Sequence, residues 1–384
     1  MAVWIDTAPA ENAPAIFGLP PLTRLRRSLA KTLPNEHSIL LSDGTSGPAG
    51  KRLRAALLAS DGPLLVIDGS TLIDSRLIGF LGKQTAATLA FHGEGKEKAA
   101  IAVLTPDLAD KIDVDAPTLL AVCEGLSAAG AVSTLANDAM PGFMANLRRS
   151  IDYWLFTVPD DETRRKLERW MFWSNYKGST DLLTRWVFPP IVWPLTRLAT
   201  KFHIHPNLIT LVSIVFTFAA VPAFMNGHFL LGFILSFGMC ILDSVDGKVA
   251  RVTLTDSPIG NILDHGLDII HPPLWYGAWA FGLGGASFGD PMFDAALWLI
   301  GFYVADRIIL GIAKARFKRG LHAMTALDGA VRAIIARRNI NLVIFGVALL
   351  IGQGPAGLIA VTVWQGLTLL WHTVRTIMLK PLPR

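Results

Sequence analysis

The chain has little cysteine. Cys123 and Cys240 are the only two cysteines in 384 residues, and one lies in each half of the sequence. Two cysteines are too few for a disulfide framework or a cysteine-ligated metal cluster. We therefore expect both to be buried thiols and the chemistry to depend on other side chains.

Charge is also scarce, because only 17% of the residues are charged and 52% are hydrophobic. The mean hydropathy of +0.44 excludes an ordinary soluble protein. Most long apolar stretches follow residue 185, whereas residues 1–180 mix charges, turns and short apolar runs. This contrast predicts a cytoplasmic domain at 1–150, a connector with an interfacial helix at 151–203, and a membrane domain at 204–384.

The first residues lack the basic and apolar regions of a signal peptide, so we expect the first domain to stay in the cytoplasm. Short apolar runs at 38–41, 64–67 and 100–104 are typical of strands, and residues 53–58 and 77–89 have helical spacing. This alternation predicts βαβ units and a mostly parallel, Rossmann-like α/β sheet.

The connector has few residues that suit a bilayer core. Residues 161–185 are charged and aromatic, and residues 186–199 contain three prolines with Arg185 and Arg197 at their flanks. We expect the first segment at the membrane surface and the second to form an interfacial helix.

Six later segments approach the roughly 20 residues that a helix needs to cross the apolar core of a bilayer. They are 208–225, 229–249, 260–283, 293–313, 340–353 and 356–374. The connections near 226–228, 284–291 and 352–356 contain no Lys or Arg, whereas the opposite side is rich in both. The positive-inside rule then predicts six transmembrane helices with both termini in the cytoplasm, as in a bacterial-type inner membrane.

Four aspartates lie within the second and third of these segments. Asp243 and Asp246 are three residues apart, and Asp264 and Asp268 are four apart, so on helices each pair shares one face. An aspartate at the centre of a membrane helix costs roughly 2.5–3.5 kcal/mol on insertion scales, so the group needs compensation. Carboxylate ligands without Cys or His favour Mg²⁺ or Mn²⁺, and two such ions suit phosphoryl transfer.

The spacing D-x2-D-G-x2-A-R-x8-G-x3-D-x3-D over residues 243–268 resembles the signature of the CDP-alcohol phosphotransferase family. The resemblance covers about residues 177–380 and includes the P-N-x-x-T pattern of residues 206–210. It implies that all four aspartates bind the two metal ions and that Asp268 is also the catalytic base. It implies a CDP-binding surface formed by Asn207, Thr210, Asp243, Asp246, Gly247, Ala250, Arg251 and Gly260.

The resemblance also implies a reaction. The hydroxyl of an acceptor alcohol attacks the β-phosphorus of a CDP-alcohol and CMP leaves, as in phospholipid or inositol-lipid synthesis. The sequence looks closest to the inositol-phosphate-type members, in which basic residues face a phosphorylated acceptor. Candidates for that contact are Lys177, Arg185, Arg337 and Arg338. Attraction to anionic lipid head groups also explains such cations, so both interpretations stay open. The family further implies membrane lipids as partners and a homodimer, with no role for nucleic acid.

The first domain resembles a sugar nucleotidyltransferase at residues 18–24 and at residues 64–69, where such a domain carries a metal-binding aspartate. No Gly-rich triphosphate loop precedes the first predicted strand, so a triphosphate lacks a cradle of backbone N–H groups. We expect a degenerate domain that acts in binding, assembly or regulation. The alternative is a bifunctional enzyme whose first domain makes the CDP-alcohol.

An ion-coupled transporter is the alternative from another class, because intramembrane aspartates also mark ion pathways. A carrier does not need the Gly, Ala and Arg positions between the carboxylates. It would also commonly show two related halves, and the sequence shows no internal repeat. The spacing therefore favours the transferase.

Overall fold

The computed structural model describes residues 1–33, 38–42, 47–136, 139–140, 142–144, 149–176, 178–256 and 258–380, and the side chains at 143, 258–265, 267 and 268 lie outside this description. The chain forms two compact units. The first comprises Met1–Ala145, Arg149–Tyr176 and Val252–Leu254, and the second comprises Asn146–Arg148, Lys177–Arg251 and Thr255–Arg384.

The first unit is built on a six-stranded sheet with the strand order β2-β1-β3-β6-β5-β7. Its strands are β1 (Ala2–Asp6), β2 (Ile39–Leu41), β3 (Leu64–Asp68), β5 (Thr88–His92), β6 (Ala99–Leu104) and β7 (Ser133–Thr134). β1 pairs in parallel with β2 and β3, and β5 in parallel with β7, whereas β6 runs antiparallel to β3 and β5. The carboxyl ends of β1 and β3 therefore lie side by side at one edge of the sheet.

Shorter elements complete this unit. β4 (Thr71–Ile73) pairs with β10 (Leu155–Thr157), and β8 (Phe143–Met144) pairs with β9 (Arg149–Ser150), both antiparallel. The helices are α1 (Pro21–Thr32), α2 (Ala49–Leu58), α3 (Ser75–Leu81), α4 (Leu119–Ala128) and α5 (Asp161–Ser174), with 3-10 turns η1 (Ala8–Ala10), η2 (Gly95–Glu97) and η3 (Pro106–Lys111).

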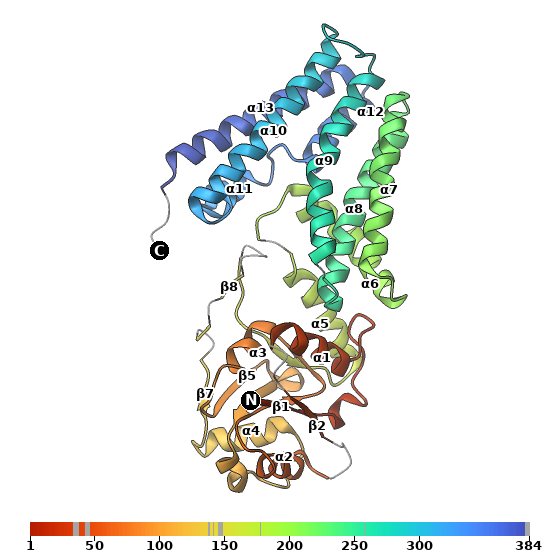
Figure 1. Cartoon of the computed structure of the whole chain (residues 1–384). Helices are drawn as coiled ribbons and strands as arrows, with labels where there is room; N and C mark the ends of the chain where they lie inside the picture. The colour runs from red at the N-terminus through yellow and green to blue at the C-terminus, as the bar shows by residue number, and fades with distance from the viewer. Residues whose placement is uncertain are drawn as a thin grey trace. The chain divides into compact units, whose positions relative to one another are not determined.

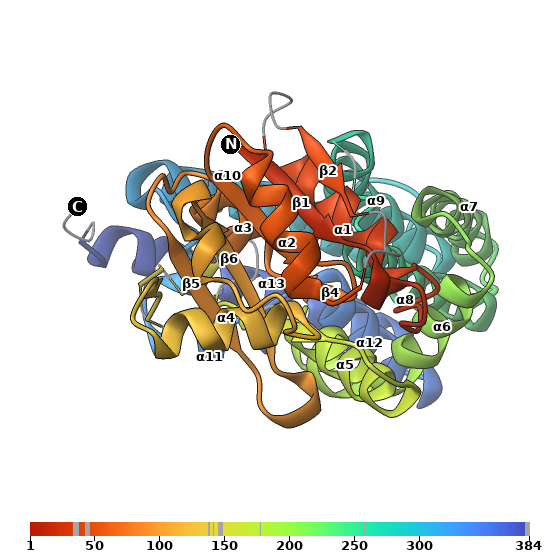
Figure 2. The same ribbon diagram turned by 90° about the horizontal axis from the view of Figure 1, so that it is seen from below.

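Alternation along the strands creates two apolar layers. Leu64 and Val66 pack with α2 and α4 on one face, whereas Leu65 and Ile67 pack with α1 and α3 on the other. Figure 1 shows these helix pairs on opposite sides of the strands, and Figure 2 shows α2 and α4 on their shared face. Both faces are covered, so β3 is apolar along almost its whole length and all five of its residues are buried.

The sequence predicted an N-terminal α/β domain, and this part of the fold prediction is confirmed. The strand β6 was predicted, but its antiparallel direction and the strand β1 were not. The predicted helical stretch at 77–89 is wrong at its end, because α3 stops at Leu81 and β5 begins at Thr88. Gly82 and the loop after it end the helix, and the β-propensity of the next apolar run then decides its conformation.

The second unit is helical. Its elements are a π-helical segment η4 (Leu183–Val187), α6 (Pro189–Lys201), α7 (Pro206–Met225), α8 (Phe229–Thr253), α9 (Pro258–Gly282), α10 (Pro291–Phe317), η5 (Leu321–Ala323), α11 (Ala326–Val331), α12 (Arg338–Leu350) and α13 (Gly354–Met378). α10 packs along α13, α7 along α9, and α12 against α13. Within this unit Figure 1 shows α10 and α13 running beside one another.

Four of these helices, within the part of the chain that the structure describes, are long and apolar enough to cross a membrane. They are α7, α8, α10 and α13. The other two predicted spans fall on α9 and on α12, and α12 has only 13 residues. A helical region with four candidate spans is thus established by length and composition, and the count of six stays a prediction.

Candidate functional site

The second helix of the membrane region carries the first two motif aspartates. Asp243 and Asp246 are less than one turn apart on α8 and so project from the same side. Asp246 is only 7% exposed, and its Oδ2 accepts a hydrogen bond of 2.6 Å from Thr210 Oγ1 on α7. Thr210 belongs to the P-N-x-x-T segment that sequence analysis joined to the motif, and the structure brings the two together.

The start of α7 explains why this segment has its sequence. His205 is the N-cap, and its Nδ1 accepts a hydrogen bond of 3.2 Å from the backbone N–H of Asn207. Pro206 occupies the first helical position, where a missing N–H is harmless. The Asn207 side chain is exposed. Thr210 follows one turn later, on the side that reaches α8.

Arg338, the first residue of α12, forms an ion pair with Asp243. The two residues are 95 positions apart in the sequence. Their side chains are 16% and 22% exposed, respectively, so the pair is only partly shielded from water. Of the basic residues proposed for a phosphorylated acceptor, Arg338 is therefore one that lies at the motif.

Gly247 and Arg251 meet on the same helix, one turn apart. A Cβ added at Gly247 would lie 3.3 Å from Nη1 of Arg251, which is a tight contact. Glycine at this position thus gives the Arg251 guanidinium room to lie close to the backbone of α8. Ala250, also half-buried, keeps the neighbouring position small.

Arg337 precedes Arg338 but has a different partner. Its Nη1 lies 3.8 Å from Oδ2 of Asp181, in the connector before α6. The same carboxylate accepts hydrogen bonds from Thr184 N (3.0 Å) and Asn339 Nδ2 (3.2 Å). Burial would raise the pKa of Asp181, but the charge of Arg337 and the bonds from Thr184 and Asn339 outweigh it and hold the pKa below its ordinary value. Sequence analysis missed Asp181, whose only signal is its position three residues before Thr184, a helix-capping distance.

Other predicted residues are not brought together. Arg185 is exposed and lies over the ring of Trp186, with 5.3 Å between its Cζ and the ring centroid. Lys177 lies outside the described residues. Gly260, Asp264 and Asp268 belong to α9, but their side chains lie outside the description.

The donor set fits a hard divalent cation. Asp243 and Asp246 offer only carboxylate oxygens as metal ligands, and the Thr210 hydroxyl beside Asp246 is also an oxygen ligand. Mg²⁺ and Mn²⁺ prefer such ligands. Among the described side chains no cluster of three or more His, Cys, Asp or Glu residues forms a metal site. The described side chains thus supply two carboxylates of the predicted four-aspartate set.

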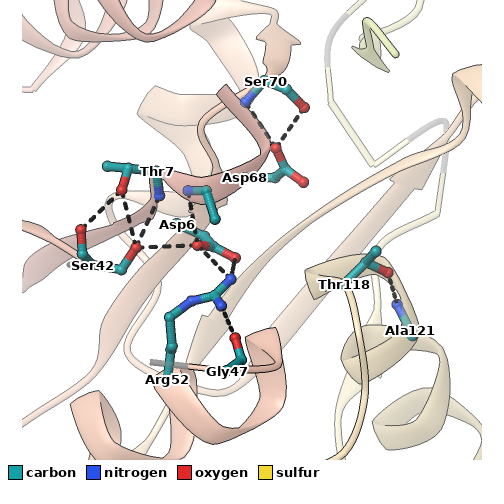
Figure 3. Close-up of polar contacts among 10 residues, drawn as sticks. Asp6, Thr7, Ser42, Gly47, Arg52, Asp68, Ser70, Thr118 and Ala121 are labelled. Carbon is teal, nitrogen blue, oxygen red and sulfur yellow. Dashed lines mark hydrogen bonds and ion pairs between the residues drawn. The ribbon is translucent and has the colours of Figure 1, made fainter. Parts of the chain in front are cut away.

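The first unit holds a second polar cluster, at the carboxyl ends of β1 and β3 (Figure 3). Asp6 is completely buried, and Nη2 of Arg52 donates to its two carboxylate oxygens at 2.8 and 2.6 Å. Asp68 is 9% exposed, and its Oδ1 accepts from Ser70 N and Ser70 Oγ. Burial raises the pKa of Asp68, against the opposing effect of the bonds from Ser70. The carboxylate at the end of β1 therefore already has an internal cation.

Comparison with known proteins decides the family of the helical region. The family model described as CDP-alcohol phosphatidyltransferase matches residues 203–378. These residues belong to the CDP-alcohol phosphatidyltransferase family. The match includes α7 and α8 with Thr210 and both described motif aspartates, as the motif spacing predicted.

Two proteins show what this CDP-alcohol phosphatidyltransferase region is similar to, one by sequence and one by structure. The archaetidylinositol phosphate synthase of Aeropyrum pernix is 41% identical over 71 residues, which cover 18% of this chain and 37% of that protein. A crystal structure of Mycobacterium tuberculosis phosphatidylinositol phosphate synthase with CDP-DAG bound is 18% identical and has a TM-score of 0.40. That likeness covers 49% of this chain and 94% of the other. The sequence match therefore spans little more than a third of the curated relative.

Proposed function

We propose that the chain transfers a substituted phosphate group from a CDP-alcohol to an acceptor alcohol, with release of CMP, in phospholipid or inositol-lipid synthesis. The observation that carries the proposal is the meeting of Asp243, Asp246, Thr210 and Arg338 from three helices inside the matched region. Carboxylates with a guanidinium and a hydroxyl suit a substrate that carries phosphates and divalent cations.

The family generally uses divalent metal ions. We propose that Asp243, Asp246, Asp264 and Asp268 hold two Mg²⁺ or Mn²⁺ ions, which when bound neutralise the charge of the pyrophosphate. Thr210 fixes the direction of the Asp246 carboxylate through its 2.6 Å bond. The rest of the CDP moiety lies, in this proposal, against Asn207, Gly247, Ala250, Arg251 and Gly260.

The proposed reaction is a single displacement at the β-phosphorus of the CDP-alcohol. The acceptor O–H loses its proton to the Asp268 carboxylate while its oxygen forms a bond to the β-phosphorus of the donor. The bond from that phosphorus to the bridging oxygen breaks, and CMP leaves with the electron pair. A carboxylate next to the hydroxyl need not be strongly basic, because it accepts the proton only as the new P–O bond forms.

We propose a phosphorylated acceptor of the inositol-phosphate type. The position of Arg338 at the motif supports this, and so does Arg337 beside it, because guanidinium groups bind phosphate through paired N–H donors. The relative from Aeropyrum pernix is an archaetidylinositol phosphate synthase, which agrees with such an acceptor. Arg185 is exposed over Trp186, and we assign it to the membrane surface instead.

The test is CMP release from a panel of CDP-alcohols and acceptors, with and without inositol phosphate, at fixed Mg²⁺ or Mn²⁺. We expect release from at least one pair, and loss of release on removal of the metal. The control is Asp268→Asn, which should be inactive if Asp268 is the base. Full activity of that variant would refute the assignment, and no release from any pair would refute the function.

We propose that the first unit does not transfer nucleotides. In support, the carboxyl end of β1 holds the buried Asp6–Arg52 pair, and Arg52 also donates to the carbonyl of Gly47. A triphosphate at this edge would need the cations and N–H groups that this pair already engages. Pyrophosphate release from CTP, an alcohol phosphate and Mg²⁺ would overturn the proposal and establish the bifunctional alternative.

The membrane arrangement remains part of the proposal. We place both termini in the cytoplasm, because the loops that are rich in Lys and Arg lie on one side of the predicted spans. A homodimer is expected by resemblance to the family. Labelling of single cysteines introduced at each terminus, from each side of a sealed vesicle, tests the first statement, and the mass of the protein in detergent tests the second.

A further inference from the structure

Asp181 lies outside the motif and outside residues 203–378, yet it contacts the start of α12. Its side chain is only 3% exposed. Both carboxylate oxygens are engaged: Oδ1 by Thr184 N, Thr184 Oγ1 and Asn339 Nδ2, and Oδ2 by Thr184 Oγ1 and the charge of Arg337. One carboxylate thus joins the beginning of η4 to the beginning of α12.

Hydrogen bonds also hold the backbone before α12 in the same region. Leu182 N donates to the carbonyl of Ala333 at 3.0 Å, and Ser179 Oγ donates to the carbonyl of Gly329 at 3.4 Å. On the other side, Ala336 N donates to Thr368 Oγ1 of α13 at 2.9 Å. These bonds fix the backbone that leads into Arg337, and Asp181 is a partner of its side chain.

The negative charge of Asp181 lies beside the N-terminus of α12. Arg337 is the N-cap of α12 and has no side-chain hydrogen bond to the first turn. A carboxylate near such a terminus is favoured by the positive end of the helix dipole. Asn339, in the first turn, carries a buried Oδ1 without a hydrogen-bond partner among the described residues, while its Nδ2 points to Asp181. The carboxylate therefore orients the amide as well as the guanidinium.

We propose that Asp181 is a positioning residue of the transferase, which holds Arg337 in the direction of a phosphorylated acceptor and keeps the start of α12 in place for Arg338 at Asp243. This proposal rests on the function proposed above. Asp181 touches no reacting atom in it and acts through the two arginines. The connector thereby becomes part of the acceptor site.

The experiment compares Asp181→Asn, Asp181→Glu, Arg337→Gln and the double variant Asp181→Asn/Arg337→Gln. We expect Asp181→Asn to raise KM for the phosphorylated acceptor and to lower kcat/KM by about 10- to 100-fold, as for other groups that orient a ligand-binding side chain. KM for the CDP-alcohol should stay close to the wild-type value. Asp181→Glu should recover part of the loss, because it keeps the charge.

The double variant distinguishes positioning from a general loss of stability. If Asp181 acts through Arg337, the double variant loses no more acceptor affinity than the worse single variant. Independent, multiplicative losses would overturn the proposal. Should Asp181→Asn fail to fold, Arg337→Gln decides alone, because an unchanged KM for the acceptor in that variant would equally refute it.

Hydrogen exchange gives a readout that needs no activity. Asp181→Asn should speed exchange of the amides at 332–341, and the matched control Asp290→Asn should not. Asp290 is the N-cap residue of α10, and its carboxylate accepts bonds from Ala286 N and Ser287 N in the connection between α9 and α10. Wild-type protection in Asp181→Asn would refute the positioning role. If the wild type releases no CMP while exchange changes as expected, the function fails and the positioning contact stands.

Discussion

The two units both place an arginine against a buried or half-buried aspartate, and they differ in how much water reaches the pair. The side chains of Arg52 and Asp6 in the first unit are 7% and 0% exposed. Those of Arg338 and Asp243 in the helical unit are 16% and 22% exposed. A closed pair stabilises structure, whereas a partly open pair leaves oxygen and nitrogen atoms for a ligand.

This difference in exposure indicates which aspartates of the chain a substrate can reach. The first unit satisfies its carboxylate at the end of β1 internally, with Arg52 and the hydroxyl of Ser42. The helical unit holds Asp246 and Asp243 on one face of α8 and supplies each with a different partner. Buried aspartates are costly in both units, but only the second arrangement suits a cation-bearing substrate.

The largest expected effect comes from removing a motif carboxylate. Asp246→Asn should lower CMP release by at least about 1000-fold, because loss of a metal-binding charge removes several kcal/mol of transition-state stabilisation. The matched control is Asp74→Asn in the first unit, where a 3% exposed aspartate pairs with Arg76 at 2.6 Å. The control should keep wild-type release per folded molecule. Equal losses of CMP release in both variants would contradict a special role for the motif carboxylate.

The next effect concerns stability in the first unit. Arg52→Ala leaves Asp6 buried without its cation and should destabilise the unit by about 3–5 kcal/mol. Arg54, two positions later on α2, pairs with Asp110 at 2.8 Å with side chains 42% and 83% exposed. Arg54→Ala should change stability by less than about 1 kcal/mol. Thermal unfolding of the full chain in detergent measures both, and similar losses would contradict the assignment of Arg52 as the buried partner.

The sequence predicted well what depends on local pattern. Apolar runs of four and five residues located β3 and β6, and the spacing of Asp243 and Asp246 located the motif on a helix, which is α8. Apolar segments of bilayer length coincide with α7, α8, α10 and α13. These features follow from periodicity and composition, which a single sequence contains.

Contacts between residues far apart in the sequence could not be predicted from the sequence alone. The strand Ala2–Asp6 was missed although it is as long as β3, and its place in the sheet is set by pairing with β2 and β3. Arg338 was one of four basic candidates, and nothing in the sequence joins it to Asp243, 95 residues away. Asp181 was missed because one aspartate in a polar connector gives no pattern, and its contacts are with Asn339 and Arg337, more than 150 positions away in the sequence.

A smaller effect is expected from the glycine of the motif. Gly247→Ala places a Cβ 3.3 Å from Nη1 of Arg251, so the guanidinium must shift by a few tenths of an ångström. We expect CMP release to fall by about tenfold, less than the roughly 100-fold that a misplacement of about 1 Å causes. The control is Gly277→Ala on α9, where an added Cβ meets nothing within 4 Å. Wild-type kinetics in Gly247→Ala would show that Arg251 need not lie close to the helix backbone.

The smallest effect is a pH dependence of stability, with one carboxylate in each unit. Burial raises the pKa of Asp68 above that of an unfolded chain, so the folded state binds the proton more tightly. The stability from this group is complete below the ordinary aspartate pKa of about 3.9 and is lost as the pH rises through the folded pKa. Asp68→Asn should remove that loss, so the variant gains stability relative to the wild type as the pH rises.

Asp181 has a lowered pKa, so its effect on stability has the opposite sign: the stability that it contributes is lost as the pH falls. Unfolding curves of Asp68→Asn and Asp181→Asn against wild type from acid to neutral pH measure both slopes, and slopes of the same sign would show that one of the two carboxylates is not in the environment described.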